Sequence, residues 1–234
     1  MRSILVLISC LLAFALPAAA QTYTVSDVTP TDSETIDFNG LSELGGSEVL
    51  VDGLTSSMTY LLQSITHDGG DNTNDWLLQI SVSNTSTAPT TSTLTAVGFD
   101  MGGYDSIISA SADGVYFSEV DTNGQFPMGV GRLDVCVTGF NGQCAGGGGG
   151  LTAGETETFY LMLTMSDAIT SFTMSDFAVR YQAIYSGEDF QGASGIGLVT
   201  TIPEPATWLM MIIGFGIVSA STRRTRHKAN ITRA

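Results

Sequence analysis

The sequence predicts an all-β fold: an antiparallel β-sandwich of jelly-roll or immunoglobulin-like type, followed by a single C-terminal transmembrane helix. Three observations support this prediction. Several short runs within residues 21–202 alternate apolar and polar side chains, which is the period of a strand with one buried face. Turn-forming residues separate these runs, and no long stretch there has the period of a helix. A separate apolar segment lies at about 206–221.

The N-terminal 20 residues have the features of a secretory signal peptide. Arg2 provides a positive charge, the apolar run 4–16 follows, and the expected cleavage lies between Ala20 and Gln21. The run is shorter than the roughly 20 residues that span a bilayer, which disfavours a permanent anchor. Lipidation at Cys10 is a second alternative, disfavoured because the apolar run continues past this residue. We therefore expect a signal peptidase to process the chain.

Residues 21–202 are enough for one domain, and they are strongly acidic. This segment contains all 23 acidic residues of the chain except Glu204, and its only basic residues are Arg132 and Arg180, so its formal net charge is −20. Such a surface repels nucleic acids and anionic lipids. We therefore expect no nucleic-acid partner, and we expect the charge to keep an exported domain soluble.

Cys136 and Cys144 are the two cysteines left after signal cleavage, and together they predict one intramolecular disulfide. Free thiols and an intermolecular bridge are the alternatives. The glycine run 146–150 follows the second cysteine. No phosphate-binding lysine or dinucleotide fingerprint accompanies it, so we expect a flexible loop.

The strands are predicted in chain order from alternation and from the turns between them. The runs with the clearest alternation are 76–83, 133–138, 159–164 and 177–182. Weaker strand candidates are 22–28, 47–52, 57–66, 90–99, 114–120 and 195–200. Turns are expected at Asn39-Gly40, Asp52-Gly53, Asp68-Gly69-Gly70, Asp113-Gly114, Asn123-Gly124 and Asn141-Gly142.

One acidic loop is a candidate calcium site. Calcium prefers several oxygen ligands from carboxylates and amides. The loop offers five such side chains within eight residues: Asp68, Asp71, Asn72, Asn74 and Asp75. Their spacing differs from that of an EF-hand, and Asp and Asn are also common turn formers. We expect no other cofactor.

The domain offers few groups for catalysis, so we expect no enzyme activity. His67 is its only histidine, it contains no lysine, and no Gly-x-Ser-x-Gly motif is present. A pair of carboxylates could hydrolyse glycosides, but the sequence does not locate such a pair. A carbohydrate-binding module is another alternative, with Tyr104, Tyr116 and Tyr185 as candidate stacking residues.

The C-terminal segment has three parts in a fixed order. Pro203, Glu204 and Pro205 come first, an uncharged apolar stretch at about 206–221 follows, and the basic cluster 223–228 comes last. The prolines disfavour helix and keep the entry extended, as a processing enzyme requires. The apolar stretch predicts a membrane-spanning helix, whose basic end stays in the cytoplasm. An ordinary C-terminal anchor is the alternative.

This tail resembles the PEP-CTERM sorting signal of Gram-negative bacteria, over residues 203–228. The resemblance implies that an exosortase recognises the motif, cleaves near it, and releases the protein from an inner-membrane-anchored precursor to the cell surface or the extracellular space. Proteins with this signal often accompany exopolysaccharide and biofilm production. The resemblance therefore implies a structural or adhesive protein of the envelope or extracellular matrix, with exopolysaccharide as a further expected partner.

Overall fold

The computed structural model describes residues 22–26, 33–68, 70–102, 107–139, 141–147 and 149–199. Within these residues the chain forms twelve β-strands and no helix, so the all-β prediction is confirmed. Alternating burial along the strands explains why they form: β4, for example, alternates half-exposed and buried positions over its whole length.

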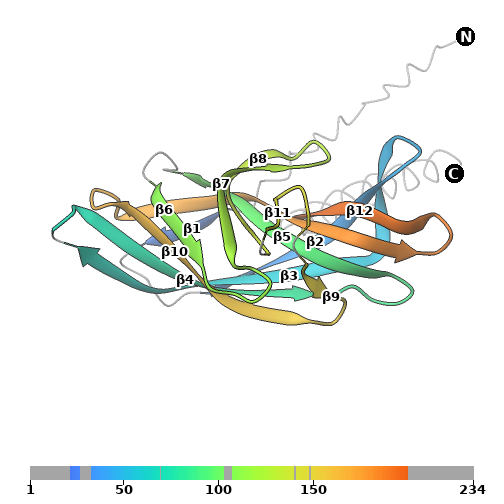
Figure 1. The fold of residues 1–234 in the computed structure, drawn as a ribbon, viewed down its shortest axis with the longest axis horizontal. Helices are drawn as coiled ribbons and strands as arrows, with labels where there is room; N and C mark the ends of the chain where they lie inside the picture. The colour runs from blue at the N-terminus through green and yellow to red at the C-terminus, as the bar shows by residue number, and fades with distance from the viewer. Residues whose placement is uncertain are drawn as a thin grey trace, which may run out of the picture. The chain divides into compact units, whose positions relative to one another are not determined.

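The strands follow one another with short connections. Their bounds are β1 Tyr23–Ser26, β2 Ser33–Leu44, β3 Ser47–Asp68, β4 Thr73–Asn84, β5 Thr91–Gly102, β6 Ile107–Ala112, β7 Glu119–Phe126, β8 Gly131–Thr138, β9 Leu151–Thr152, β10 Thr156–Ser166, β11 Ser171–Ser186 and β12 Phe190–Val199. Figure 1 shows the long strands β3, β10 and β11 running across most of the sheet.

All twelve described strands are hydrogen-bonded into one antiparallel sheet. The order is β6-β10-β4-β3-β2-β12-β11-β5-β8-β7, while β1 pairs with β11 and β9 pairs with β5. Long strands such as β3 hydrogen-bond to neighbours along both edges, so the ladder is never interrupted between two separate sheets. The all-β, antiparallel part of the prediction is confirmed, and the observed sheet is barrel-like.

The two outermost strands of this order, β6 and β7, are consecutive in the chain. The segment between them bonds to strands near both margins of the sheet: the Asp113 amide donates to the Tyr160 carbonyl of β10, and the Ser118 amide donates to the Thr138 carbonyl of β8. The sheet therefore curls until its margins approach one another, and its arrangement is barrel-like (Figure 1).

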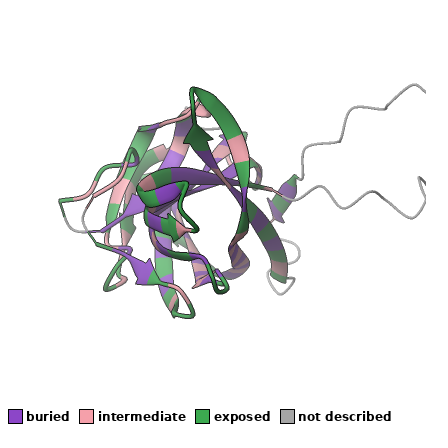
Figure 2. Ribbon diagram, turned by 90° about the vertical axis from the view of Figure 1, so that its right-hand side faces the viewer, coloured by how far each residue is buried: buried purple, intermediate pink, exposed green. Residues whose placement is uncertain are grey.

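One large apolar core fills the inside of the curled sheet. Figure 2 shows buried positions alternating with exposed ones along the strands. Trp76, Tyr60 and Tyr181 are its largest fully buried side chains, and Tyr60 packs edge-on against Phe99 with ring centroids 6.0 Å apart. A second, smaller cluster includes Phe126, Leu133 and both cysteines of the disulfide.

Strand β3 contains the largest irregularity of the sheet. Asn39 pairs with Thr55, but Leu41, two residues later, pairs with Leu50, so β3 carries extra residues at this point. Two bonds hold the extra residues in place, one from the Thr87 amide to the Gly53 carbonyl and one from the Thr90 hydroxyl to the Asp52 carbonyl.

Several predicted turns and strands differ from the structure. The pairs Asn39-Gly40, Asp52-Gly53 and Asn123-Gly124 lie inside β2, β3 and β7, so the turns predicted there are wrong. Gly53 and Asn123 do have positive φ, which explains the turn-like residue choice. The strand predicted at 114–120 begins only at Glu119, while β2, β6 and β9 were not predicted.

Ala20–Thr200 forms one compact unit of the chain. Within the residues that the structure describes, no helix has the length and apolar character needed to cross a membrane. The predicted transmembrane helix at about 206–221, the cleavage site at Ala20 and Gln21, and the motif Pro203, Glu204 and Pro205 lie outside the described residues.

Candidate functional site

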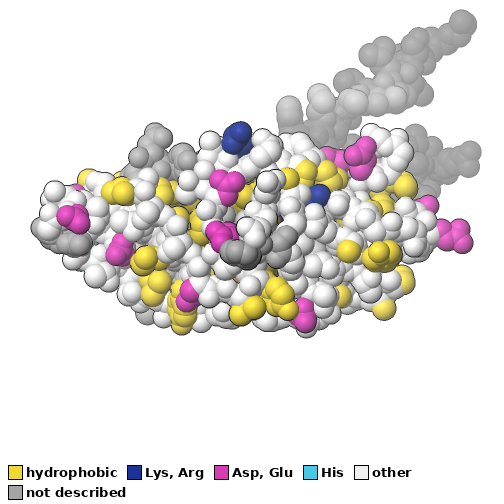
Figure 3. Space-filling model, in the orientation of Figure 1, with side chains coloured by type: hydrophobic (Ala, Val, Ile, Leu, Met, Phe, Trp, Pro, Cys, Tyr) yellow, Lys and Arg dark blue, Asp and Glu magenta, His cyan; other side chains and the backbone are white. Residues whose placement is uncertain are grey.

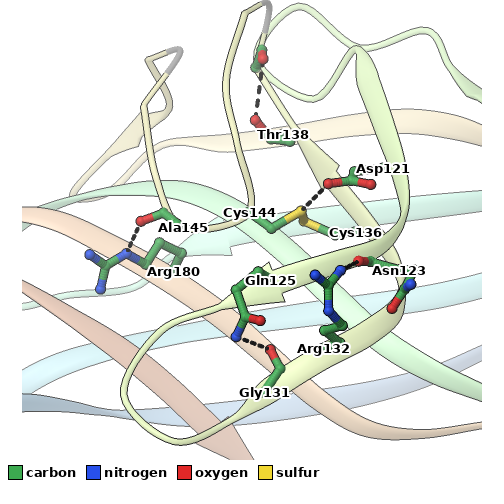
Figure 4. The surroundings of a disulfide bond; sticks show 11 residues. Asp121, Asn123, Gln125, Gly131, Arg132, Cys136, Thr138, Cys144, Ala145 and Arg180 are labelled. Carbon is green, nitrogen blue, oxygen red and sulfur yellow. Dashed lines mark hydrogen bonds between the residues drawn. A yellow bond between two sulfur atoms is a disulfide. The ribbon is translucent and has the colours of Figure 1, made fainter.

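The disulfide lies beneath the loop that follows β8. Cys136 and Cys144 are joined, with their Cα atoms 6.1 Å apart, as the sequence predicts. Both are buried, and Gly124 of β7 packs so closely on them that a Cβ there would lie 2.3 Å from the Cys144 sulfur. Asp121 Oδ2 lies 3.8 Å from the same sulfur, which carries no proton in the oxidised state (Figure 4). The bridge therefore closes a short loop onto β7 and β8.

Arg180 of β11 connects this loop to the sheet. Its Nε donates to the Ala145 carbonyl at 2.9 Å (Figure 4). Its Nη1 donates to the Gly195 carbonyl of β12 at 2.9 Å. The side chain is buried, with 7% of its surface exposed, and burial lowers its pKa from the ordinary value. Arg180 therefore has a structural role, because its charged group is held by two backbone carbonyls.

Three acidic residues come near one another on β5, β8 and β11. Burial raises the pKa of Asp100, and the charges of Asp134 and Asp176 raise it further, while a hydrogen bond from the Asp134 amide opposes the increase. The Asp134 carboxylate in turn accepts the Met101 amide at 2.9 Å. These backbone bonds hold Asp100 and Asp134 at the sheet surface.

Two residues of the candidate calcium loop, Asn74 and Asp75, lie on opposite faces of β4. Asn74 is buried and accepts a hydrogen bond from the His67 ring at 2.7 Å, whereas Asp75 is on the opposite face of β4 and accepts one from the Thr164 hydroxyl. Asp71 and Asn72 belong to the turn before β4, and Asp68 ends β3. In the described part of the chain, no group of three or more His, Cys, Asp or Glu residues is arranged to hold a metal ion.

The candidate stacking tyrosines lie in different parts of the chain. Tyr116 is in the segment between β6 and β7, and its amide donates to the Glu157 carboxylate of β10. Tyr185 belongs to β11 and is 50% exposed. Tyr104 lies outside the described residues. The two described tyrosines are on separate elements of the chain.

A different tyrosine lies on a regular, outward-facing surface. Tyr160 and Met162 alternate along β10 with the buried core residues Phe159 and Leu161, so they point away from the core. We call the outward side chains Tyr160, Met162 and Thr158 of β10 and Leu77, Gln79 and Ser81 of β4 the Tyr160 face. The alternation that predicts the strand at 159–164 also places Tyr160 on the side opposite to Phe159. The sequence therefore already indicates that Tyr160 faces away from the core.

Acidic side chains do not gather into one patch on the face shown in Figure 3. They are spread singly there, and uncharged polar and hydrophobic side chains occupy most of the area. Arg132, the other arginine of the domain, is exposed and donates to the Asn123 carbonyl at 2.8 Å. On this face the acidic charge is therefore spread out rather than focused on one site.

The chain matches the family model of the PEP-CTERM protein-sorting motif over residues 201–226. The match includes Pro203, Glu204 and Pro205, the apolar stretch and most of the basic cluster, which is the order of parts seen in the sequence. Comparison with curated proteins finds no match, and comparison with solved structures finds none either.

The recognised motif is therefore the functional segment that sequence comparison identifies in this chain. It implies processing by an exosortase and a membrane-anchored precursor that is sorted to the cell surface. The chain is a protein that carries a C-terminal PEP-CTERM sorting motif.

Proposed function

We propose that this exported protein is a non-enzymatic structural or adhesive component of the extracellular polysaccharide layer. The observation that carries the proposal is the PEP-CTERM motif at residues 201–226, which implies delivery to the cell exterior. A single antiparallel sheet with a large apolar core and a disulfide supports a durable module that works outside the cell.

The distribution of polar groups supports a binding or structural role over catalysis. His67 bonds to the buried Asn74 amide oxygen, and the Asp134 carboxylate accepts a backbone amide. These groups are engaged in holding the fold, which is the ordinary role of hydrogen-bonded polar groups. The proposal therefore assigns no catalytic residue to the domain.

Deletion of Pro203–Pro205 tests the export part of the proposal. We expect the deleted protein to accumulate unprocessed in the inner membrane, because an exosortase reads this motif. Immunoblotting of membrane and surface fractions, with mass spectrometry of the surface form, measures the effect. Deletion of residues 229–231, which follow the matched region, is the matched control and should leave processing unchanged. Surface protein that retains Arg223–Lys228 contradicts the proposal.

A strain without the protein tests the matrix part. We expect cells that lack it to retain less polysaccharide and to attach less to a surface, with both restored by the wild-type gene. The Pro203–Pro205 deletion should fail to restore them. Unchanged attachment and polysaccharide retention in the strain without the protein would exclude a matrix role.

Carbohydrate binding is a second candidate function, favoured by one observation. The Tyr160 face combines an exposed aromatic ring with amide and hydroxyl side chains on a regular sheet surface. Sugar rings stack on aromatic side chains through their apolar faces, while their hydroxyls form hydrogen bonds. This combination is the basis of the inference below.

A further inference from the structure

The Tyr160 face lies on the adjacent strands β10 and β4, whose register is regular, and β3 borders β4 on its other side. Tyr160 of β10 pairs with Gln79 of β4, and Gln79 pairs with Leu61 of β3. One step along the same face, Met162 pairs with Leu77. Side chains that lie directly opposite one another in such pairs have Cβ atoms about 5 Å apart. Tyr160, Met162 and Leu77 therefore form one small apolar patch, with amide groups beside it.

The apolar side chains of this patch are accessible. Tyr160 is 40% exposed and Met162 is 39% exposed, although both belong to a strand whose alternate residues are fully buried. The backbone of Tyr160 is fixed at both its amide and its carbonyl, because the amide donates to the Asp113 carboxylate at 2.7 Å and the carbonyl accepts the Asp113 amide. The ring is thus presented from a rigid element rather than from a loop.

The polar side chains around the patch are held in place by one another. Gln63 Nε2 donates to Gln79 Oε1 at 2.6 Å, and the Thr158 hydroxyl donates to the Ser81 hydroxyl at 3.1 Å. A primary amide nitrogen has two donors, and a hydroxyl oxygen has two acceptor sites. Within the described residues, the Gln79 amide nitrogen has no partner. These groups therefore keep hydrogen-bonding capacity for a ligand in fixed positions.

The charge of the surroundings limits the kind of ligand. Strands β3, β4 and β10 contain no lysine or arginine. Two acidic groups beside the face are already hydrogen-bonded: Asp75, beyond one end of it, accepts the Thr164 hydroxyl, and Asp113, across the β10 edge from Tyr160, accepts the Tyr160 amide. A polymer with carboxylate or phosphate groups would be repelled by the net charge of −20 and would find no cation on this face. An uncharged ligand avoids both penalties.

We propose that the Tyr160 face binds an uncharged polysaccharide, with the Tyr160 ring stacked on a sugar ring and Gln79, Ser81 and Thr158 bonded to sugar hydroxyls. A protein partner fits less well, because stable protein interfaces need about 1,000 Å² and an apolar centre larger than these three side chains. The inference rests on the proposed function, since a protein delivered to the exterior meets polysaccharide there.

Affinity electrophoresis of the purified full chain tests the inference. The probes are two neutral polysaccharides, amylose and a soluble β-1,4-glucan, and one anionic polysaccharide, alginate, each cast in a native gel. We expect a neutral glucan to retard the wild-type protein and alginate to leave its mobility unchanged. We expect Tyr160→Ala to weaken binding about tenfold, or ~1.4 kcal/mol, and Tyr160→Phe to keep it within about twofold, because the ring remains.

Leu198→Ala is the matched control, because Leu198 of β12 is a similarly exposed apolar residue on a strand outside the face, with 38% of its surface exposed. It should bind like the wild type, and all variants should keep the wild-type urea midpoint. Absence of retardation by both neutral glucans overturns the inference, as does equal binding by Tyr160→Ala and Leu198→Ala. A change of oligomeric state in Tyr160→Ala, with glucan binding intact, would instead assign the face to a second copy of the chain.

Failure of this inference is distinguishable from failure of the proposed function. Binding is measured with purified protein and reports only on the Tyr160 face. Export is measured by the state of the tail in surface fractions, which a Tyr160 substitution leaves unchanged. A protein that is processed normally but does not bind neutral glucans would retain the matrix role and lose this site.

Discussion

Arg180 illustrates how single buried polar groups hold this fold together. It spans the space between the disulfide-closed loop and β12, where it donates to two backbone carbonyls. Asn84 has a similar role at the end of β4, since its amide nitrogen donates to the carbonyls of Ser92 and Leu151. Each side chain joins segments that are distant in the sequence, and each donates to two backbone carbonyls.

Replacement of Arg180 by alanine should lower the free energy of unfolding by about 1–3 kcal/mol, because the Ala145 and Gly195 carbonyls would lose their donors. Urea denaturation of the purified protein measures this change. Arg132→Ala is the matched control, because Arg132 is exposed and donates one bond. It should change the stability by less than about 0.5 kcal/mol. Equal effects of the two substitutions would contradict the structural role of Arg180.

At the scale of elements, the irregularity in β3 depends on one glycine of β2. The extra residues of β3 bring Leu54 directly over Gly40, where a Cβ would lie 2.2 Å from Leu54 Cγ. Leu54 is buried, so it has little room to move aside. A glycine that the sequence marks as a turn is therefore a point of close packing inside a strand.

Gly40→Ala should destabilise the protein by about 1–3 kcal/mol, because the added methyl group overlaps the Leu54 side chain. Leu54→Ala alone should cost about 2–5 kcal/mol through loss of buried apolar contacts. The double variant should lose less stability than the sum of the losses of the two single variants, since Leu54→Ala removes the side chain that the added methyl group overlaps. Thermal denaturation of the three variants measures this coupling. Strict additivity would show that the two residues do not compete for the same space.

Strands β4, β10 and β2 show where the prediction of strands from sequence succeeds and where it fails. Strands with strong alternation, such as β4 and β10, were predicted because their periodicity is local and their burial alternates along most of their length. Strand β2 was missed, although Ile36 and Phe38 are buried on one side of it, because Asn39-Gly40 suggested a turn. An Asn-Gly pair can occur in a hairpin turn or inside a strand that packs closely on a neighbour, and the pair by itself does not distinguish the two.

For the whole molecule, the dominant feature is an acidic domain with almost no cations to oppose its charge. Its two arginines bond to backbone carbonyls, Arg180 to two and Arg132 to one. Repulsion among like charges raises the free energy of the compact state. Stability should therefore depend on the ionic strength of the solution.

An increase in NaCl from 10 mM to 150 mM should raise the melting temperature of the protein. Salt at this concentration screens exposed charges beyond about 8–10 Å. A gain of roughly 1 kcal/mol would correspond to about 2–4 °C for a domain of this size. Differential scanning calorimetry at several NaCl concentrations measures the shift. A melting temperature that falls with salt would show that attractive ion pairs outweigh the repulsion.

The sequence by itself determined the all-β class, the disulfide pair and the sorting tail. These features depend on local alternation, on the presence of only two cysteines in 21–202, and on a motif with parts in a fixed order. Only the tertiary structure decided that the strands form one curled sheet, that Gly40 packs on Leu54, and that Tyr160 lies beside Gln79. Hydrogen bonds between strands join residues far apart in the chain, and such pairings leave no periodic pattern in the sequence.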